Sequence, residues 1–230
     1  MDIPPTTPHF VSRRLVAERS GGLPQEEQLV LVLDDDLAIL RGLERLLTAH
    51  GYRVRLHSEA EDFFRAGLPT VSACLILDNQ LGNGTTGIEV HAELQRRAWD
   101  IPTVFVTAHW NVQSVVDAMR AGADGFLTKP YEPQELVDAV AQALQRASSK
   151  RQDEVLITQV RTKAASLTTR EREIVQLVIA GLLNKEIADR LNLAVVTVKI
   201  HRGRAMRKLG AGNPAELARL AVLAGFIPSP

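Results

Sequence analysis

Between residues 28 and 147, short apolar runs alternate with amphipathic segments, and this alternation constrains the fold more than any other feature of the chain. The runs predicted as strands are 29–33, 52–57, 74–78, 102–107 and 125–128. The segments predicted as helices are 36–50, 59–66, a stretch after Gly87, 112–121 and 133–147. Strands buried on both faces need helices on both sides of the sheet. We therefore expect an α/β domain with a five-stranded parallel sheet and right-handed crossovers.

The remainder of the chain has a different pattern. From Thr168 onward the sequence predicts short helices, at about 169–180, 184–191, 196–209 and 214–224. Residues 148–166 are predicted as a linker that can be helical, with a hinge-like start at 148–151. Residues 1–27 are rich in Pro and Gly and are predicted as a mobile extension with a short helix near 10–19. The expected domains are thus 28–147 and an all-α four-helix domain at 167–226.

Charge separates the same two parts. Residues 1–150 carry 14 Lys and Arg against 20 Asp and Glu, whereas residues 151–230 carry 13 against 7. An acidic first part and a basic second part indicate two domains with different partners. A basic domain is also what a solubilising surface produces, so charge alone favours nucleic acid only mildly.

Cys74 is the one cysteine of the chain, which excludes an intramolecular disulfide framework. We expect no membrane span, because no apolar stretch approaches the roughly 18–20 residues that a span requires. The N-terminus also lacks the apolar core of a secretory signal. Cytoplasmic localisation is the resulting expectation.

The strand that ends in Asp78 gives the first indication of a site. Asp34 and Asp35 follow the first predicted strand, Asp78 ends the third, Thr107 the fourth, and Lys129 follows the fifth. Carboxyl ends of parallel strands meet at one edge of the sheet, where such folds bind ligands. Each of these residues alone has a common structural explanation, such as an aspartate that caps a turn. The ordered set, one element at each strand end, favours a functional pocket.

The chemistry of that set points to phosphoryl transfer. Clustered carboxylates repel each other by roughly 4 kcal/mol per pair at about 4 Å and an effective dielectric near 20. A hard cation such as Mg²⁺ relieves this repulsion and keeps water ligands free for a phosphate oxygen. A lysine supplies a charge for the phosphoryl group and a threonine a hydroxyl donor. Together they suit an aspartate nucleophile.

Residues 28–147 resemble the receiver domain of two-component response regulators. The resemblance rests on four segments: LVLDDD at 31–36, LILD at 75–78, TAH at 107–109 and FLTKPY at 126–131. It implies a flavodoxin-like strand order, 2-1-3-4-5. It also implies a cis peptide bond between Lys129 and Pro130.

The same resemblance assigns roles within the pocket. It makes Asp78 the phosphoacceptor, and it makes Thr107 and Lys129 the groups that bind the phosphoryl oxygens. Phe126 occupies the aromatic switch position, which would move together with Thr107 and remodel the face formed by the fourth helix, fifth strand and fifth helix. The implied ligands of Mg²⁺, or of Mn²⁺, are Asp34, Asp35, Asp78 and the backbone carbonyl of Gln80.

Two features depart from the receiver pattern. The family loop usually reads L-P-G-M-S-G, whereas residues 81–87 read LGNGTTG, without proline and one residue longer. This difference bears on loop stiffness and on the lifetime of the phosphoryl group. Trp110 stands where relatives often have glycine, which suits either a partner contact or packing over the fourth helix.

The C-terminal helices have the rhythm of a helix-turn-helix. The segment 184–191 is predicted as its first helix, 192–195 as the turn and 196–209 as the second helix. Apolar residues at core spacing alternate in the second helix with basic ones, an arrangement that suits a DNA major groove and its phosphates. A solubilising face is the plainer explanation of the same charges.

Residues 165–225 resemble the LuxR/FixJ-type DNA-binding domain. The matching segments are LTTREREI at 167–174, AGLLNKEIA at 180–188 and TVKIHR at 197–202. By position, Lys199, Ile200 and Gly203 would face the groove, and the side chains nearer the phosphates would be Thr197, Arg202, Arg207 and Lys208.

Two positions in the second helix depart from that pattern. Ala194 replaces the usual serine N-cap, a loss worth about 1 kcal/mol. Gly203 in mid-helix indicates a close backbone approach, either to DNA or to a neighbouring helix. In the last helix Leu217, Leu220 and Leu223 suit either dimerisation or packing within the domain.

The sequence therefore predicts a transcriptional response regulator of the LuxR/FixJ type. A sensor histidine kinase would phosphorylate Asp78, and the receiver would dimerise and bind promoter DNA as a homodimer, with RNA polymerase as a further partner. The chain is expected not to be an enzyme, since a phosphohydrolase needs a second acid two residues after the nucleophile, where Gln80 stands. A receiver-fold transcription factor that works without phosphorylation is the alternative interpretation.

Overall fold

The computed structural model describes residues 28–82, 84–108 and 122–227. Contacts divide the chain into two compact units, Met1–Ser149 and Lys150–Pro230. The predicted extension at 1–27, the helix at 112–121, His109 and Trp110 lie outside the described residues.

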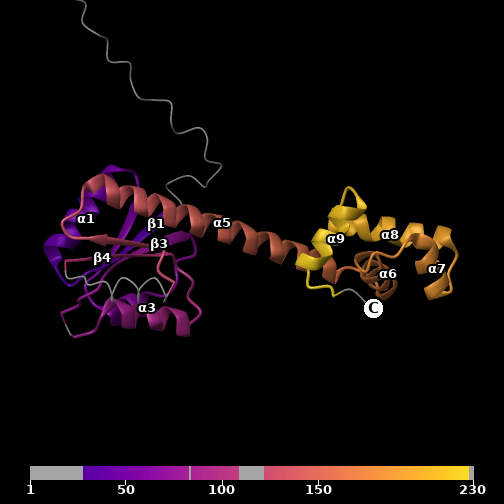
Figure 1. Ribbon diagram of the computed structural model, residues 1–230, viewed down its shortest axis with the longest axis horizontal. Helices are drawn as coiled ribbons and strands as arrows, with labels where there is room; N and C mark the ends of the chain where they lie inside the picture. The colour runs from indigo at the N-terminus through magenta and orange to yellow at the C-terminus, as the bar shows by residue number, and fades with distance from the viewer. Residues whose placement is uncertain (1–27, 83, 109–121, 228–230) are drawn as a thin grey trace, which may run out of the picture. The chain divides into compact units, whose positions relative to one another are not determined.

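The first unit is built on the five-stranded parallel sheet that the alternation predicts (Figure 1). Its strand order is β2-β1-β3-β4-β5, so the expected flavodoxin-like topology is confirmed. β3 lies at the centre and all seven of its residues are buried, whereas β2 is an edge strand with alternating exposure. The strands are β1 (Gln28–Leu33), β2 (Arg53–His57), β3 (Ser72–Asp78), β4 (Thr103–Thr107) and β5 (Gly125–Thr128).

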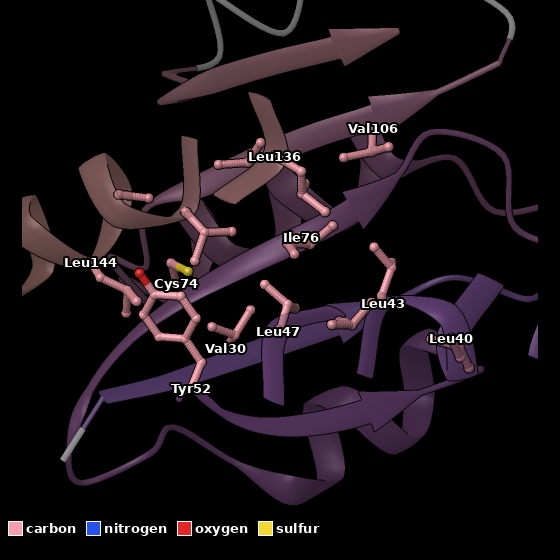
Figure 2. Close-up of a cluster of buried hydrophobic side chains, with 14 residues drawn as sticks. Val30, Leu40, Leu43, Leu47, Tyr52, Cys74, Ile76, Val106, Leu136 and Leu144 are labelled. Carbon is pink, nitrogen blue, oxygen red and sulfur yellow. The ribbon is translucent and has the colours of Figure 1, made fainter. Parts of the chain in front are cut away.

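Alternate residues of β1, β3, β4 and β5 enter two separate cores. Val30, Cys74 and Ile76 pack with leucines of α1 (Leu37–Ala49) and α5 (Pro133–Ala165), as Figure 2 shows. Their neighbours along the strands pack on the opposite face of the sheet against α2 (Ala60–Ala66) and α3 (Gly87–Arg96). This period of two is the reason why the central strands read as continuous apolar runs.

Local signals set where the helices begin. The Asp36 carboxylate caps α1 by accepting from the backbone N–H of Ala38 at 2.7 Å. Thr86 and Glu89 form a reciprocal capping box at the start of α3. As a result, both helices begin immediately after a loop that carries pocket residues.

The predicted end of the fifth helix at residue 147 is wrong, because α5 continues to Ala165. Residues 148–165 of the predicted linker are therefore helical. Between Pro133 and Ala165 there is no glycine and no further proline, and serines at 148 and 149 reduce helix propensity only slightly. Since nothing in this stretch ends a helix, the hinge-like start expected at 148–151 does not interrupt α5.

The described residues of the second unit form four further helices, as predicted. They are α6 (Thr169–Ile179), α7 (Asn184–Leu191), α8 (Val195–Leu209) and α9 (Pro214–Leu223). Leu217 and Leu220 of α9 are buried in this unit, Leu217 in a core with Leu209 of α8 and Val175 of α6. Packing within the domain thus accounts for two of the three leucines that also suited dimerisation, and the third, Leu223, is half-buried. No helix among the described residues is long and apolar enough to cross a membrane.

Gly87 offers a test of how tightly the fold closes around the end of β3. A Cβ atom at Gly87 would lie 2.5 Å from the carbonyl oxygen of Asp78, a backbone atom that cannot move aside cheaply. We expect Gly87→Ala to destabilise the first unit by about 1–3 kcal/mol through overpacking. Both tryptophans, Trp99 and Trp110, belong to this unit, so tryptophan fluorescence during urea unfolding reports its stability.

Gly42→Ala is the matched control. Gly42 is exposed within α1, and a Cβ there would meet no atom within 4 Å. This substitution should raise stability by roughly 0.5–1 kcal/mol, because alanine is the better helix former. Equal urea midpoints for Gly87→Ala and the unmodified protein would contradict the close approach at Gly87.

Candidate functional site

Lys129 joins the two buried carboxylates at the carboxyl edge of the sheet. Its ammonium nitrogen Nζ lies 2.9 Å from Asp34 Oδ2 and 3.0 Å from Asp78 Oδ1. The three residues come from the ends of β1, β3 and β5, far apart in the sequence. The structure therefore brings together three of the pocket residues that the sequence predicts.

The second oxygen of each carboxylate is held by the chain's own backbone. Asp34 Oδ1 accepts from the N–H of Asp36 at 2.9 Å, and Asp78 Oδ2 accepts from the N–H of Gln80 at 2.7 Å. Each aspartate is thus fixed on one side by the turn that follows it and on the other by Lys129. This arrangement orients both carboxylates at the edge of the sheet.

Burial and hydrogen bonding compete in setting the charge of Asp78. Burial raises the pKa of Asp78 above its ordinary value, and the bonds from Lys129 and the Gln80 N–H offset this only partly. Burial opposes the charge on Lys129 too, but hydrogen bonds to Asp34 and Asp78 outweigh it, so the pKa of Lys129 is raised. Lys129 therefore stays cationic, and burial makes the charged form of Asp78 costlier than it is in water.

Asp35 occupies a different position from the other two aspartates. Its side chain is exposed, and Oδ2 lies 2.7 Å from where a Cβ on Gly82 would be. A surface pocket of about 450 Å³ adjoins it, lined by Asp35, Leu37, Ser58, Glu59, Leu81 and Gly82. Sequence reasoning missed Gly82, whose lack of a side chain leaves room for the Asp35 carboxylate over the loop. The glycine in place of the proline usual in receiver domains was the sequence signal that could have pointed to it.

The three aspartates do not form a ready-made metal centre. Within the described part of the chain, no three Asp, Glu, His or Cys side chains are grouped so as to hold a metal ion. Asp34 and Asp78 share the ammonium of Lys129, while Asp35 lies toward Gly82. Oxygen ligands of this kind still fit a hard cation, because two carboxylates against one lysine leave net negative charge.

Thr107 and Phe126 lie on the two strands that lead into the pocket. The Thr107 carbonyl accepts from the backbone N–H of Lys129 at 2.8 Å, which ties the end of β4 to the residue after β5. Thr107 is buried, and Phe126 is half-buried against the core on the α3 side. The peptide bond between Lys129 and Pro130 is cis, as the resemblance implied.

The loop that departs from the receiver pattern is closed by its own hydrogen bonds. Gln80 and Thr86 form an antiparallel bridge, and the Leu81 N–H donates to the carbonyl of Thr85 at 3.1 Å. Gly84 has a positive φ of 84°, a conformation that glycine adopts without strain. The absence of proline is thus compensated by a bridge that fixes both ends of the loop.

In the second unit, α7 and α8 form the predicted helix-turn-helix. α7 ends at Leu191, and the left-handed conformation of the next residue, Asn192, turns the chain toward α8. Ile187 and Ala188 of α7 pack with Val198 of α8 in a small core. Arg202 also donates to the Asn184 side chain at 2.9 Å, so it ties the two helices together.

Lys208 has a partner that the sequence did not reveal. Its Nζ lies 2.6 Å from Glu171 Oε2 and 2.9 Å from the carbonyl oxygen of Ser166. Glu171 is only 2% exposed and also accepts from the backbone of Thr168 at the start of α6. Lys208 therefore fastens the end of α8 to the beginning of α6. A glutamate in a capping box was the only sequence signal for this buried acid.

The structure bears on two expectations for α8. No side chain caps its N-terminus, where Ala194 stands. A Cβ on Gly203 would meet no atom of the described residues within 4 Å, so the neighbouring-helix explanation of this glycine is wrong. The backbone at Gly203 is open to an external partner, and Lys199, Ile200 and Arg207 are exposed on the same helix.

Comparison with known proteins matches both units. Residues 30–141 match the family model described as the response regulator receiver domain, and residues 165–221 match the one described as bacterial regulatory proteins of the luxR family. Nodulation protein W of Bradyrhizobium diazoefficiens is 36% identical over 198 residues, 86% of this chain and 87% of its own. Transcriptional regulatory protein FixJ of Azorhizobium caulinodans is 34% identical over 200 residues, 87% of this chain and 94% of its own.

Two solved structures extend the similarity to the architecture. The low-resolution structure of response regulator StyR is 40% identical, with a TM-score of 0.74 over 85% of this chain and 98% of that one. Full-length FixJ from B. japonicum is 32% identical, with a TM-score of 0.53 over 88% of this chain and 99% of that one.

The raised pKa of Asp78 predicts how stability depends on pH. Folding favours the neutral carboxyl group, so its charge destabilises the first unit above the folded pKa. Asp78→Asn should therefore raise the urea midpoint at neutral pH. The gain should shrink as pH falls through the folded pKa and vanish below the ordinary value of 3.8, where the carboxyl is neutral in both states.

Urea unfolding followed by tryptophan fluorescence at several pH values measures this effect. Asp138→Asn, at an exposed carboxylate on α5, is the matched control and should leave the midpoint nearly unchanged. A midpoint for Asp78→Asn at or below that of the unmodified protein at neutral pH would contradict the prediction.

Proposed function

The chain belongs to the response regulators that join a receiver domain to a LuxR-type DNA-binding domain, and from this we propose that phosphoryl transfer to Asp78 controls its binding to promoter DNA. The observation that carries the proposal is the pair of ion contacts from Lys129 to Asp34 and Asp78. They unite the acceptor, its acidic neighbour and a phosphate-binding cation in one pocket.

Asp78 is the proposed nucleophile. Its carboxylate is oriented by the Gln80 N–H and by Lys129, which fixes the approach to a phosphoryl donor. The Lys129 ammonium is placed to neutralise charge on the incoming phosphoryl oxygens, and the Thr107 hydroxyl supplies a hydrogen bond at the end of β4. The proposed donor is the phosphohistidine of a sensor histidine kinase.

We assign the metal ligands to Asp34, Asp35, Asp78 and the backbone carbonyl of Gln80. Mg²⁺, or Mn²⁺ in its place, would neutralise charge on the transferred group when bound. The residues fit because buried Asp34 and Asp78 are only partly balanced by Lys129. Asp35 adds a third carboxylate from the exposed side of the pocket, where Gly82 leaves it space.

Phosphorylation would act on the rest of the chain through β4 and β5. A phosphoryl group bonded by Thr107 and Lys129 would pull on two residues that already share a backbone hydrogen bond. Phe126 of β5 lies beside Phe105 of β4 in the register of the sheet and would move together with Thr107. The proposed result is a homodimer that brings two DNA-binding units to paired half-sites.

We assign the DNA-binding surface to α8 and its surroundings. Lys199, Ile200 and Gly203 would face the groove, and Thr197, Arg202 and Arg207 the phosphates. Lys208 is left out of this surface, because it is bonded to Glu171 and Ser166. Bound in this way in the cytoplasm, the dimer would regulate transcription, with RNA polymerase as a partner, rather than turn over a substrate.

Acetyl phosphate with Mg²⁺ tests the acceptor directly. The full chain should gain one phosphoryl group, located at Asp78 by mass spectrometry, and omission of the divalent cation should suppress the reaction. Asp78→Asn should remain unlabelled. Asp138→Asn, an exposed carboxylate on α5, is the control that should label normally.

DNA binding by the same samples separates the two interpretations of the chain. If phosphorylation controls binding, the labelled protein should dimerise and bind duplex DNA more tightly than the unlabelled protein. Label at a residue other than Asp78 would overturn the assignment. An unlabelled protein that is already dimeric and binds equally well would support the phosphorylation-independent alternative.

Salt dependence tests the assignments of Arg207 and Lys208. Each phosphate contact contributes about −0.9 to the slope of log affinity against log salt concentration. We expect Arg207→Met to weaken binding and reduce this slope by about that amount. Lys208→Met should also weaken binding, because α8 loses its anchor on Glu171, but should leave the slope unchanged.

Equilibrium binding of a fluorescent duplex over a range of salt concentrations gives both values. Circular dichroism of Lys208→Met and the milder Lys208→Arg verifies that the domain stays folded, and Lys208→Arg should restore binding. A slope reduced equally by Lys208→Met and Arg207→Met would instead place Lys208 on a phosphate.

A further inference from the structure

The outward face of α8 carries apolar side chains where a basic helix would be expected to carry polar ones. Val196 is 64% exposed and Ile200 is 49% exposed, although both belong to a helix with exposed Lys199, Arg204 and Arg207. Neither apolar side chain belongs to a hydrophobic core of the second unit. Exposure of two large apolar residues on one short helix marks a contact surface.

Helical spacing places these residues on one line. Val196, Ile200, Gly203 and Arg207 follow each other at intervals of four, three and four residues, so they share a face of α8. At about 100° per residue this face lies opposite to Val198, Ala205 and Leu209, the buried residues of the helix. We define these four residues as the outer ridge of α8.

The outer ridge is shaped for close approach by a partner. At Gly203 a Cβ would meet no atom of the described ranges within 4 Å, so the backbone itself is accessible there. Exposed basic side chains flank the ridge, Lys199 on one side and Arg204 on the other, and Arg207 ends it. Basic groups around an apolar line complement a groove that has apolar groups inside and phosphates along both edges.

Resting on the proposed function, we infer that Val196 and Ile200 read the C5-methyl groups of thymines in the major groove. Aliphatic side chains form no hydrogen bonds to base edges, and the thymine methyl is the apolar group that bases present in that groove. Four residues of helix rise about 6 Å, against about 3.4 Å per base-pair step. The pair therefore reaches thymines on base pairs one or two steps apart in each half-site.

This assignment adds a specificity determinant at Val196 and gives Ile200 a defined chemical target. Lys199 and Arg207 would supply hydrogen bonds and phosphate contacts, which act at many sequences. The two methyl contacts would then determine which of the DNA sequences bound by these basic residues are bound most tightly. Removal of a single methyl group from the DNA should then weaken binding about fourfold, the value of one buried methyl or methylene.

Replacement of thymine by deoxyuridine tests the inference, since it deletes only the methyl group. The full chain, treated with acetyl phosphate and Mg²⁺, is used to enrich a duplex from a random-sequence pool. Each thymine of the enriched site is then replaced singly by deoxyuridine, and the dissociation constant is measured. We expect about fourfold weaker binding at two positions in each half-site, one or two base pairs apart.

Variants identify the residue that reads each methyl. Val196→Ala and Ile200→Ala should each abolish the difference between thymine and deoxyuridine at one of the two positions and leave the other intact. Both side chains are exposed and alanine is the better helix former, so the variants keep the fold. Val222→Ala, at an exposed apolar residue of α9, is the control and should retain both differences.

The outcomes distinguish this inference from the function on which it rests. Failure to enrich any duplex overturns the proposed function and the inference together. Specific binding that is insensitive to every deoxyuridine overturns the inference alone. A difference between thymine and deoxyuridine that persists in both Val196→Ala and Ile200→Ala also overturns it. The outer ridge would then be a surface for a protein partner.

Discussion

The contact of Lys129 with both Asp34 and Asp78 is the interaction on which the first unit depends. Two carboxylates are buried at the edge of the sheet, and each would be costly there without a cation. One lysine cannot neutralise both, so the pocket retains negative charge while its geometry is fixed. The structure thus fixes the orientation of the Asp78 carboxylate and leaves negative charge in the pocket that a further cation would balance. Both properties follow from the same three side chains at three strand ends.

The sequence was sufficient to predict this pocket because parallel strands bring their carboxyl ends together at one edge of the sheet. Once β1, β3 and β5 are recognised as parallel strands, Asp34, Asp78 and Lys129 must meet at one edge, whatever their separation in sequence. The position of Asp35 was not predictable in the same way. It depends on the space above Gly82, a contact between two loops that periodicity does not encode. The end of α5 was also mispredicted. A helix that contains no helix-breaking residue continues as far as its packing allows, and the sequence pattern does not show where that packing ends.

In the second unit, too, some features could be predicted from the sequence and others could not. Helix positions and the core residues of α7 and α8 follow from apolar spacing, and the structure confirms them. The partners of individual basic residues do not follow, because a sequence does not show which acid lies opposite. Glu171 and Lys208 are separated by most of the domain yet form an ion pair at 2.6 Å. Gly203 is the opposite case. Its low helix propensity suggested that a neighbouring helix packs closely against it, yet a Cβ there would meet no atom of the described residues within 4 Å.

These pairings change how the basic charge of the second unit should be understood. Its excess of Lys and Arg suggests nucleic acid, but a paired ammonium is not available to a phosphate without the loss of its first partner. Lys208 holds α8 on α6 through the buried carboxylate of Glu171, whereas the partner of Arg202 is the neutral, half-buried side chain of Asn184. Lys199 and Arg207 are exposed, next to the apolar side chains of the outer ridge. Charge on this helix therefore has two tasks, to position the helix and to attract the partner, and burial of the opposing group decides which task a given residue performs.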